Sequence, residues 1–132
     1  MKLIGFPERL VAFVESRETT PYAWGSNDCA TFLADAVIEV RGTDLLEGLR
    51  GSWSNQAEAQ AVLDAQGGLI AFLDSKLPRR HVNYTQRGDV CLIRDSVGNP
   101  SLAICTGSVC AAPGPEGVER ESMNKVLMVW ET

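Results

Sequence analysis

The residues best suited to covalent chemistry lie between positions 22 and 32, where Cys29 follows Asp28 at the expected start of a helix. Tyr22 and Trp24 precede them in a glycine-bearing loop. The first amides of a helix lack partners and the helix dipole is positive there, so this position favours a thiolate. Such a site can lower a cysteine pKa, and nearby amides can bind the oxyanion formed when the thiolate attacks a carbonyl. The structural alternative is that Asp28 only caps the helix and Cys29 packs as a small apolar residue.

A cysteine nucleophile needs a base, and the chain offers one histidine, His81. His81 precedes the first expected core strand and reaches Cys29 only by an unusual chain path. A Cys–His pair needs a separation of roughly 3 Å, so His81 is a poor candidate for the base. Its other interpretation is a solvated residue beside Arg79 and Arg80. Without a base, Cys29 is a weak nucleophile and nothing obvious protonates a leaving amine.

The other three cysteines, Cys91, Cys105 and Cys110, fall on expected neighbouring strands. No pair forms a C-x-x-C motif, which leaves a zinc ribbon or a thioredoxin-like site without support. Free cysteines on strands are commonly core residues. We therefore predict no metal and no cofactor, and leave open whether these three and Cys29 together hold a metal or an iron–sulfur cluster.

Two kinds of hydrophobic pattern divide the chain near residue 78. Apolar residues three and four apart, with capping residues and glycine stops, predict helices over residues 7–17, 28–41, 57–65 and 69–77. Short apolar runs between turn residues predict strands over residues 90–94, 102–106, 109–112, 118–120 and 126–130, with turns at 95–100 and 113–117. Helices followed by an antiparallel meander indicate an α+β fold, expected as a single domain over residues 1–132.

Charge and hydropathy exclude several classes of function. The chain has 12 Lys and Arg against 17 Asp and Glu, a net charge of −5, which argues against binding nucleic acid. It has no apolar run of about 18 residues, so we expect no membrane insertion. Residues 1–7 carry one charge and too few apolar residues for a signal peptide. We therefore expect no signal peptide and a protein that is made in a cytoplasm.

The pattern Tyr22-x-Trp24-Gly25-x-x-Asp28-Cys29-x-x-Phe32 resembles the nucleophile motif of NlpC-type cell-wall peptidases, a group of papain-like cysteine peptidases. Two further landmarks follow in that family's order, Gly88-Asp89-Val90 and the strand Leu102–Gly107. The resemblance covers residues 20 to 110. It implies a papain-like NlpC-type fold with N-terminal helices packed on a C-terminal antiparallel sheet, and Cys29 at the nucleophile position.

The sequence differs from active members of the family at the position of the general base. There a histidine opens the strand that here begins its apolar run at Leu102, and the matching position is Ser101. The residue that orients this histidine would lie near Val109 or Ala111, whose side chains accept no hydrogen bond. The resemblance therefore implies a vestigial nucleophile at Cys29 and a groove lined by Tyr22, Trp24, Asp28 and Ser101.

A narrower resemblance is to small NlpC-like proteins encoded among bacteriophage tail genes, which lack the same histidine and end in a short run with a tryptophan, here Trp130. It implies a structural component of a tail tip or baseplate, assembled in the host cytoplasm, with other tail proteins as partners. Two alternatives stay open. One is a cysteine peptidase or amidase acting on peptidoglycan, with His81 or a partner's residue as base. The other is a module that binds cell-wall peptides in a groove lined by Tyr22, Trp24 and Trp53.

Overall fold

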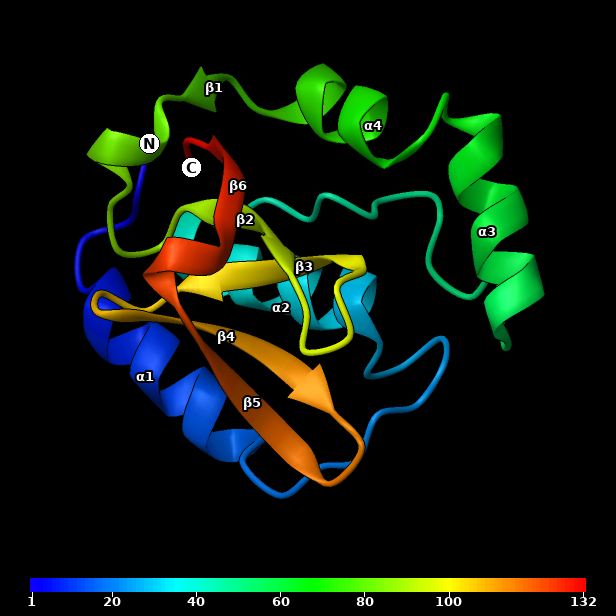
Figure 1. Cartoon of the computed structure of the whole chain (residues 1–132), viewed down its shortest axis with the longest axis horizontal. Helices are drawn as coiled ribbons and strands as arrows, with labels where there is room; N and C mark the ends of the chain where they lie inside the picture. Colours follow the sequence, from blue (N-terminus) through cyan, green and yellow to red (C-terminus); the bar gives the residue numbers. More distant parts are fainter.

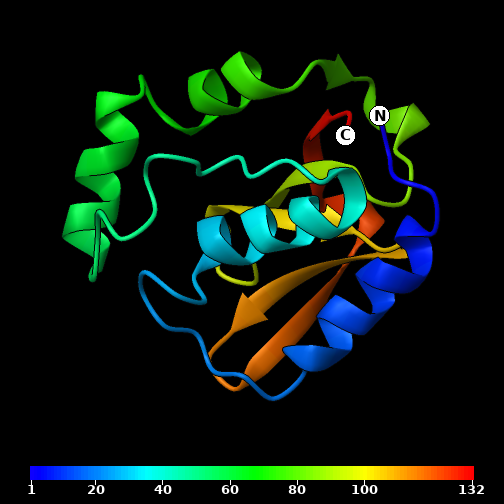
Figure 2. The same cartoon turned by 180° about the vertical axis from the view of Figure 1, so that it is seen from behind.

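The computed structural model describes all residues from 1 to 132, and its helices lie against one face of a six-stranded sheet (Figures 1 and 2). The helices are α1 (Phe6–Ser16), α2 (Cys29–Arg41), α3 (Gln56–Ala65) and α4 (Leu69–Lys76), with short 3-10 turns η1 (Val82–Tyr84) and η2 (Met123–Lys125). The strands are β1 (Arg79–Arg80), β2 (Val90–Arg94), β3 (Pro100–Cys105), β4 (Val109–Gly114), β5 (Gly117–Ser122) and β6 (Val126–Trp130). No helix has both the length and the apolar character that a membrane span requires.

Local sequence signals explain where the two core helices begin and end. Pro7 lies in the first turn of α1, where a missing N–H costs nothing, and Leu10 is buried toward the core. Asp28 is the N-cap of α2, and Gly42 ends that helix with a φ of 80°, a backbone conformation that glycine adopts readily. The two helices pack through Phe13 of α1 and Phe32 of α2, whose ring centroids lie 5.1 Å apart. All four predicted helices are thus present within one or two residues of their expected bounds.

The sheet has the strand order β1-β6-β2-β3-β4-β5, and every neighbouring pair is antiparallel. Strands β2 to β5 form the predicted meander. The final strand departs from it, because β6 does not pair with β5 but crosses back to the far side of β2 (Figure 1). The two-residue strand β1 (Arg79–Arg80), which the sequence did not predict, pairs with the outer edge of β6.

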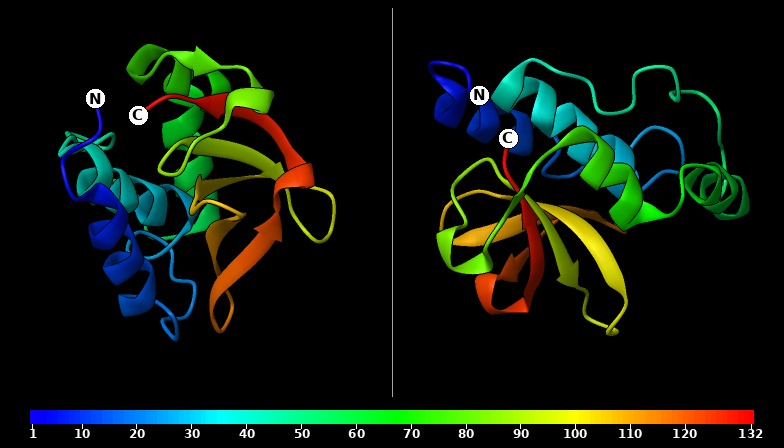
Figure 3. Two further views of the ribbon diagram at one scale, coloured as in Figure 1. Left: turned by 90° about the vertical axis from the view of Figure 1, so that its left-hand side faces the viewer. Right: turned by 90° about the horizontal axis from the view of Figure 1, so that it is seen from above.

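Residues of the central strands alternate between two buried faces. Val90, Leu92, Leu102 and Ile104 join the main core beneath α2. The intervening residues form a second, smaller core on the opposite face, namely Cys91, Ile93, Ala103, Cys105, Cys110, Ala112 and Val129. The sheet curls so that η2, between β5 and β6, closes over this smaller core with Met123 (Figure 3). Burial on both faces explains why these strands read as nearly continuous apolar runs.

The turn between β4 and β5 is tighter than the sequence predicts. Pro113 and Gly114 belong to β4 rather than to the turn. Proline is tolerated at this point because β3 pairs only as far as Ala111, so the nitrogen of Pro113 faces no ladder partner. The end of this hairpin fixes the loop before α2, since the backbone N–H of Tyr22 donates to the carbonyl of Gly114 at 2.9 Å.

Asp89 of the Gly-Asp-Val landmark joins the N-terminal segment and β1 to the sheet. Its fully buried carboxylate lies 2.8 Å from Lys2 Nζ and 3.0 Å from Arg80 Nε. Gly88 has a φ of 90°, and a Cβ there would lie 2.9 Å from Val40 of α2. The landmark therefore has a structural explanation in this chain, because the glycine allows close helix packing and the aspartate neutralises two cations.

Candidate functional site

The loop that leads into α2 is held from inside by Asn27. Its buried side-chain amide donates to the carbonyls of Thr20 and Pro21, at 3.3 and 3.0 Å. Its side-chain oxygen accepts a hydrogen bond of 2.8 Å from Arg17 at the end of α1. The Asn27 side chain thus bonds to two backbone carbonyls and to a charged donor. These bonds fix the conformation of the loop that carries Tyr22 and Trp24.

Asp28 joins three segments of the site through a buried carboxylate. One oxygen accepts from the backbone N–H of Thr31, and the hydroxyl of Thr31 accepts in turn from the N–H of Asp28, which completes a capping box. The other oxygen accepts from the backbone N–H of Gly25 at 2.8 Å and from Trp53 Nε1 at 2.7 Å. The structural interpretation of Asp28 as an N-cap therefore holds, and the Trp53 contact is a role that the sequence did not reveal.

Gly25 of the Trp-Gly motif allows a close approach of two backbone segments. Its φ is 84°, and a Cβ there would lie 2.5 Å from the carbonyl oxygen of Trp53. Any other residue would combine backbone strain with a clash. The motif thus has a local physical cause, which is the packing of the loop against the segment that carries Trp53.

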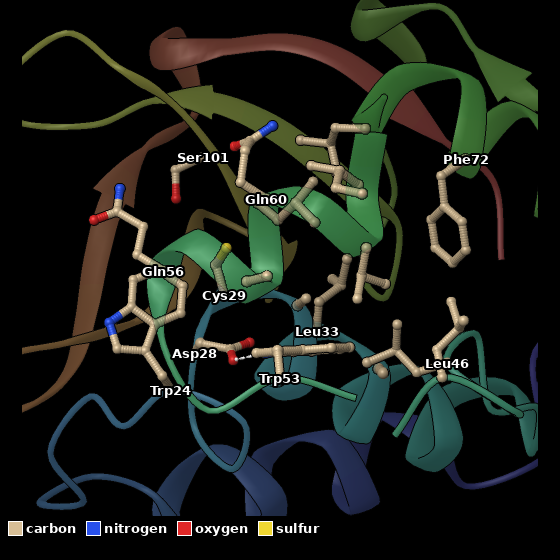
Figure 4. Close-up of a pocket in the computed structure, with 18 of the residues that line it drawn as sticks. Trp24, Asp28, Cys29, Leu33, Leu46, Trp53, Gln56, Gln60, Phe72 and Ser101 are labelled. Carbon is tan, nitrogen blue, oxygen red and sulfur yellow. Dashed lines mark hydrogen bonds between the residues drawn. The ribbon is translucent and has the colours of Figure 1, made fainter. Parts of the chain in front are cut away.

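Cys29 is the first residue of α2 and lies half-buried in the wall of a pocket (Figure 4). Its backbone N–H donates to the hydroxyl oxygen of Tyr22 at 3.4 Å. Tyr22 in turn packs edge-on against Trp24, with ring centroids 5.1 Å apart. Ser101, at the start of β3, lies on the same pocket with its hydroxyl directed toward the Cys29 end. The structure therefore brings Tyr22, Trp24, Asp28, Cys29 and Ser101 together around one cavity.

The electrostatics of this site favour the thiol rather than the thiolate. Burial and then the neighbouring Asp28 carboxylate raise the pKa of Cys29 above its ordinary value. Hydrogen bonds from the backbone amides of Leu102 and Ala30 and from the Tyr22 hydroxyl act in the opposite direction but are outweighed. A helix terminus can lower a cysteine pKa, but here burial and then the Asp28 carboxylate outweigh that effect. Burial likewise raises the pKa of Tyr22, so its hydroxyl stays protonated.

His81 lies far from this pocket. It follows β1 at one edge of the sheet, whereas Cys29 lies above β3, and β6 and β2 separate the two. Three strand spacings of about 4.8 Å correspond to about 14 Å, well beyond hydrogen-bond reach. The imidazole is exposed and its Nδ1 accepts from the backbone N–H of Asn83 at 3.1 Å. His81 is therefore the solvated residue of the second interpretation and not a base for Cys29.

The four cysteines lie on two sides of the sheet. Cys29 packs against the main core under α2, whereas Cys91, Cys105 and Cys110 belong to the smaller core on the opposite face. Cys105 and Cys110 are cross-strand partners, and the Cys110 sulfur lies 3.6 Å from that of Met123. A cluster held by all four thiols is incompatible with this arrangement. No group of three or more His, Cys, Asp or Glu residues is placed to hold a metal ion.

The pocket at Cys29 extends far beyond the residues that the sequence singled out. It has a volume of about 370 Å³, and 17 of its 25 lining residues are hydrophobic. From Cys29 and Ser101 it runs between α2 and α3 toward Leu46 and Phe72 (Figure 4). This apolar end escaped sequence analysis because its residues come from four separate segments, α2, the loop after it, α3 and α4, whose apolar positions also read as ordinary core.

Comparison with known proteins places the chain in a family. The whole chain, residues 1–132, matches the family described as Domain of unknown function (DUF6950). The chain belongs to this family. Nine chains of known structure are similar to the DUF6950 chain, among them the crystal structure of the NlpC/p60 domain of the peptidoglycan hydrolase SagA. A search of curated proteins finds no match.

The likeness to the SagA domain extends over nearly the full length of both molecules. It covers 96% of the DUF6950 chain and 98% of the SagA domain, with a TM-score of 0.59 and 22% sequence identity. At this identity the likeness establishes the fold, and the activity has to be argued from the site. The α+β, NlpC/p60-like architecture expected from the sequence is thereby confirmed.

Proposed function

We propose that this DUF6950 chain is a non-hydrolytic NlpC/p60-like domain that works by binding through the Cys29 pocket. The observation that carries the proposal is the position of Cys29, a thiol in an open pocket whose lining contains no histidine. The single imidazole of the chain lies beside β1 at one edge of the sheet, away from the pocket. A domain that has kept the pocket without the base is suited to holding a ligand rather than cutting it.

The chemistry of the site supports this proposal. Acyl transfer by cysteine needs a thiolate for attack and an acid that protonates the leaving amine. Here the raised pKa of Cys29 favours the protonated thiol at neutral pH. Removing one member of a catalytic unit costs several orders of magnitude in rate. The residual donors at Tyr22 and Leu102 cannot replace a proton acceptor, because the Tyr22 hydroxyl and the Leu102 amide both act as donors to the sulfur.

We further propose that the domain is a structural component of a bacteriophage tail tip or baseplate, with other tail proteins as partners. This setting rests on the resemblance of residues 20–110 and of the Trp130 end to tail-encoded NlpC-like proteins. An accessible apolar pocket is compatible with it, because such pockets commonly receive anchoring side chains of partner proteins.

One observation favours a second candidate, a peptidoglycan peptidase or amidase completed by another protein. The Cys29 sulfur lies at the N-terminus of α2, where the first helix amides lack helical partners, in a pocket open to solvent. A histidine supplied by a partner beside Ser101 would then restore the pair. Binding of cell-wall peptides without cleavage is less well supported, because the pocket lining offers no Lys, Arg or His to pair with their carboxylates.

The direct test is digestion of purified peptidoglycan. We expect that incubation with the chain at neutral pH releases no soluble muropeptides above the level of a Cys29→Ala control, as measured by mass spectrometry. The physical reason is the absence of a proton acceptor for the thiol. Release of stem-peptide fragments by the unmodified chain, together with its loss in Cys29→Ala, would establish the hydrolase and reject the proposal.

A further inference from the structure

The pocket at Cys29 has two chemically different ends. At the Cys29 end, three neutral polar side chains surround the opening, those of Gln56, Gln60 and Ser101 (Figure 4). The other end is lined mainly by apolar side chains, with Gln66 among the lining residues, and it contains Leu33, Leu45, Leu46, Val62, Leu63 and Phe72. A ligand that fills the pocket must therefore have an apolar part and a hydrogen-bonding part.

The charge of the lining restricts the ligand further. No Lys, Arg or His lines the pocket, and its two carboxylates, Asp28 and Asp95, are both engaged. Asp28 accepts from Trp53, Gly25 and Thr31, and Asp95 accepts from backbone amides of its own turn. An anionic group placed here would lose its hydration without gaining a cationic partner. The lining therefore disfavours an anionic occupant and accepts an uncharged one.

The side-chain amides at the opening indicate which uncharged class fits. Gln56 and Gln60 lie one helical turn apart on the pocket side of α3. A side-chain amide both donates and accepts, as a peptide unit does, whereas a hydrocarbon chain makes no use of either. Trp24 at the rim is 38% exposed and adds a rigid aromatic surface, of the kind enriched where proteins bind one another.

We propose that this pocket binds an uncharged peptide segment of a partner protein, with an aliphatic side chain seated near Leu46 and Phe72. The backbone of that segment hydrogen-bonds to the side-chain amide of Gln56 and to the side-chain oxygen of Gln60, whose Nε2 donates to Asp64 at 2.9 Å. A volume of about 370 Å³ is in the range of pockets that enclose a small ligand, and it fits one anchoring side chain with its adjoining backbone. The inference rests on the proposed non-hydrolytic function and adds the chemical class of the partner.

The tryptophans provide the readout. Trp24 and Trp53 line the pocket, whereas Trp130 is fully buried outside it with its Nε1 bonded to Asp74. We expect acetyl-Gly-Gly-Leu-Gly-Gly-amide, titrated into the full chain, to shift the indole N–H resonances of Trp24 and Trp53 and to leave that of Trp130 in place. The same peptide with glutamate in place of leucine should bind at least tenfold more weakly, because a buried carboxylate would have no partner.

Two substitutions on α3 form a matched pair. Ala59 lines the pocket, whereas Ala61 is exposed on the other side of the same helix. We expect Ala59→Phe to fill the cavity and weaken the leucine peptide at least tenfold, and Ala61→Phe to leave its affinity unchanged. The Trp130 resonance reports whether each variant keeps its fold.

Several outcomes would overturn the inference. These are saturable binding of octanamide with no binding of the leucine peptide, equal binding of the leucine and glutamate peptides, and equal effects of the two α3 substitutions. Octanamide is an uncharged aliphatic chain with one amide, so it distinguishes a lipid-like occupant from a peptide. Peptidoglycan release is measured separately, and failure of the peptide titration therefore leaves the non-hydrolytic proposal standing.

Discussion

Asp28→Ala is expected to lower the free energy of unfolding by about 4 kcal/mol, as measured by urea denaturation. Loss of the N-cap of α2 accounts for about 1 kcal/mol. The rest comes from two donors that lose their acceptor, Trp53 Nε1 and the backbone N–H of Gly25, since an unsatisfied buried polar group costs about 1–3 kcal/mol. The large effect follows from the number of segments that share one carboxylate.

Two controls define this result. Asp28→Asn keeps an acceptor for the Thr31 amide, because asparagine caps helices as well as aspartate does, so it should cost clearly less than the alanine variant. Asp64→Ala removes an exposed carboxylate from α3 and should change the free energy of unfolding by less than about 0.5 kcal/mol. Equal stability of Asp28→Ala and Asp64→Ala would show that Asp28 does not hold the site together.

Ser101→His is expected to increase the rate of alkylation of Cys29 at pH 7 at least tenfold. Ser101 faces the Cys29 end of the pocket from the start of β3 (Figure 4). An imidazolium at this position would stabilise the thiolate and offset the effect of Asp28 on the pKa of Cys29. Each unit by which that pKa falls raises the thiolate fraction about tenfold while the thiol form dominates.

Labelling with iodoacetamide, followed by intact mass, measures this rate cleanly because Cys91, Cys105 and Cys110 are fully buried. Ser101→Asn is the matched control, since asparagine is polar and of similar reach but does not titrate at this pH. A Ser101→His variant that labels no faster than Ser101→Asn would mean that this position does not reach the sulfur. Serine in place of histidine at position 101 would then not account for the lack of a base beside Cys29.

Much of the fold could be predicted because local signals and global packing agree. The α2 helix illustrates this, with an aspartate cap before it, a glycine stop after it, and apolar residues buried along its length. The central strands were equally clear, since burial on both faces makes them continuous apolar runs. Such agreement between levels is typical of segments that fold without local conflict.

The fold predictions that were wrong concern how strands distant in the sequence pair with one another. Nothing local distinguishes a final strand that continues a meander from one that crosses back, and β6 crosses back to β2. The two-residue strand β1 has no pattern of its own and exists only because β6 offers an edge. Pro113 read as a turn residue, yet it lies in β4 where β3 no longer pairs.

For the site, the sequence indicated the neighbours of Cys29 but not their electrostatics. The pattern around Cys29 placed Tyr22, Trp24, Asp28 and Ser101 at the pocket that the structure shows. The sign of the Cys29 pKa shift was missed, because it depends on burial and on the orientation of Asp28 rather than on the helix terminus alone. The apolar end of the pocket was also missed, because leucines that line a pocket cannot be distinguished from core leucines in a sequence.

The protonation state of Cys29 decides between a binding pocket and a hydrolase, and the pH dependence of its alkylation measures that state. Iodoacetamide labelling of the unmodified chain from pH 6 to pH 10 should be slow at pH 7 and accelerate only above the ordinary range of a free cysteine, as burial and Asp28 dictate. An inflection below pH 7, with fast labelling of Cys29 at neutral pH, would contradict it, because stabilisation of the thiolate would then outweigh burial and Asp28.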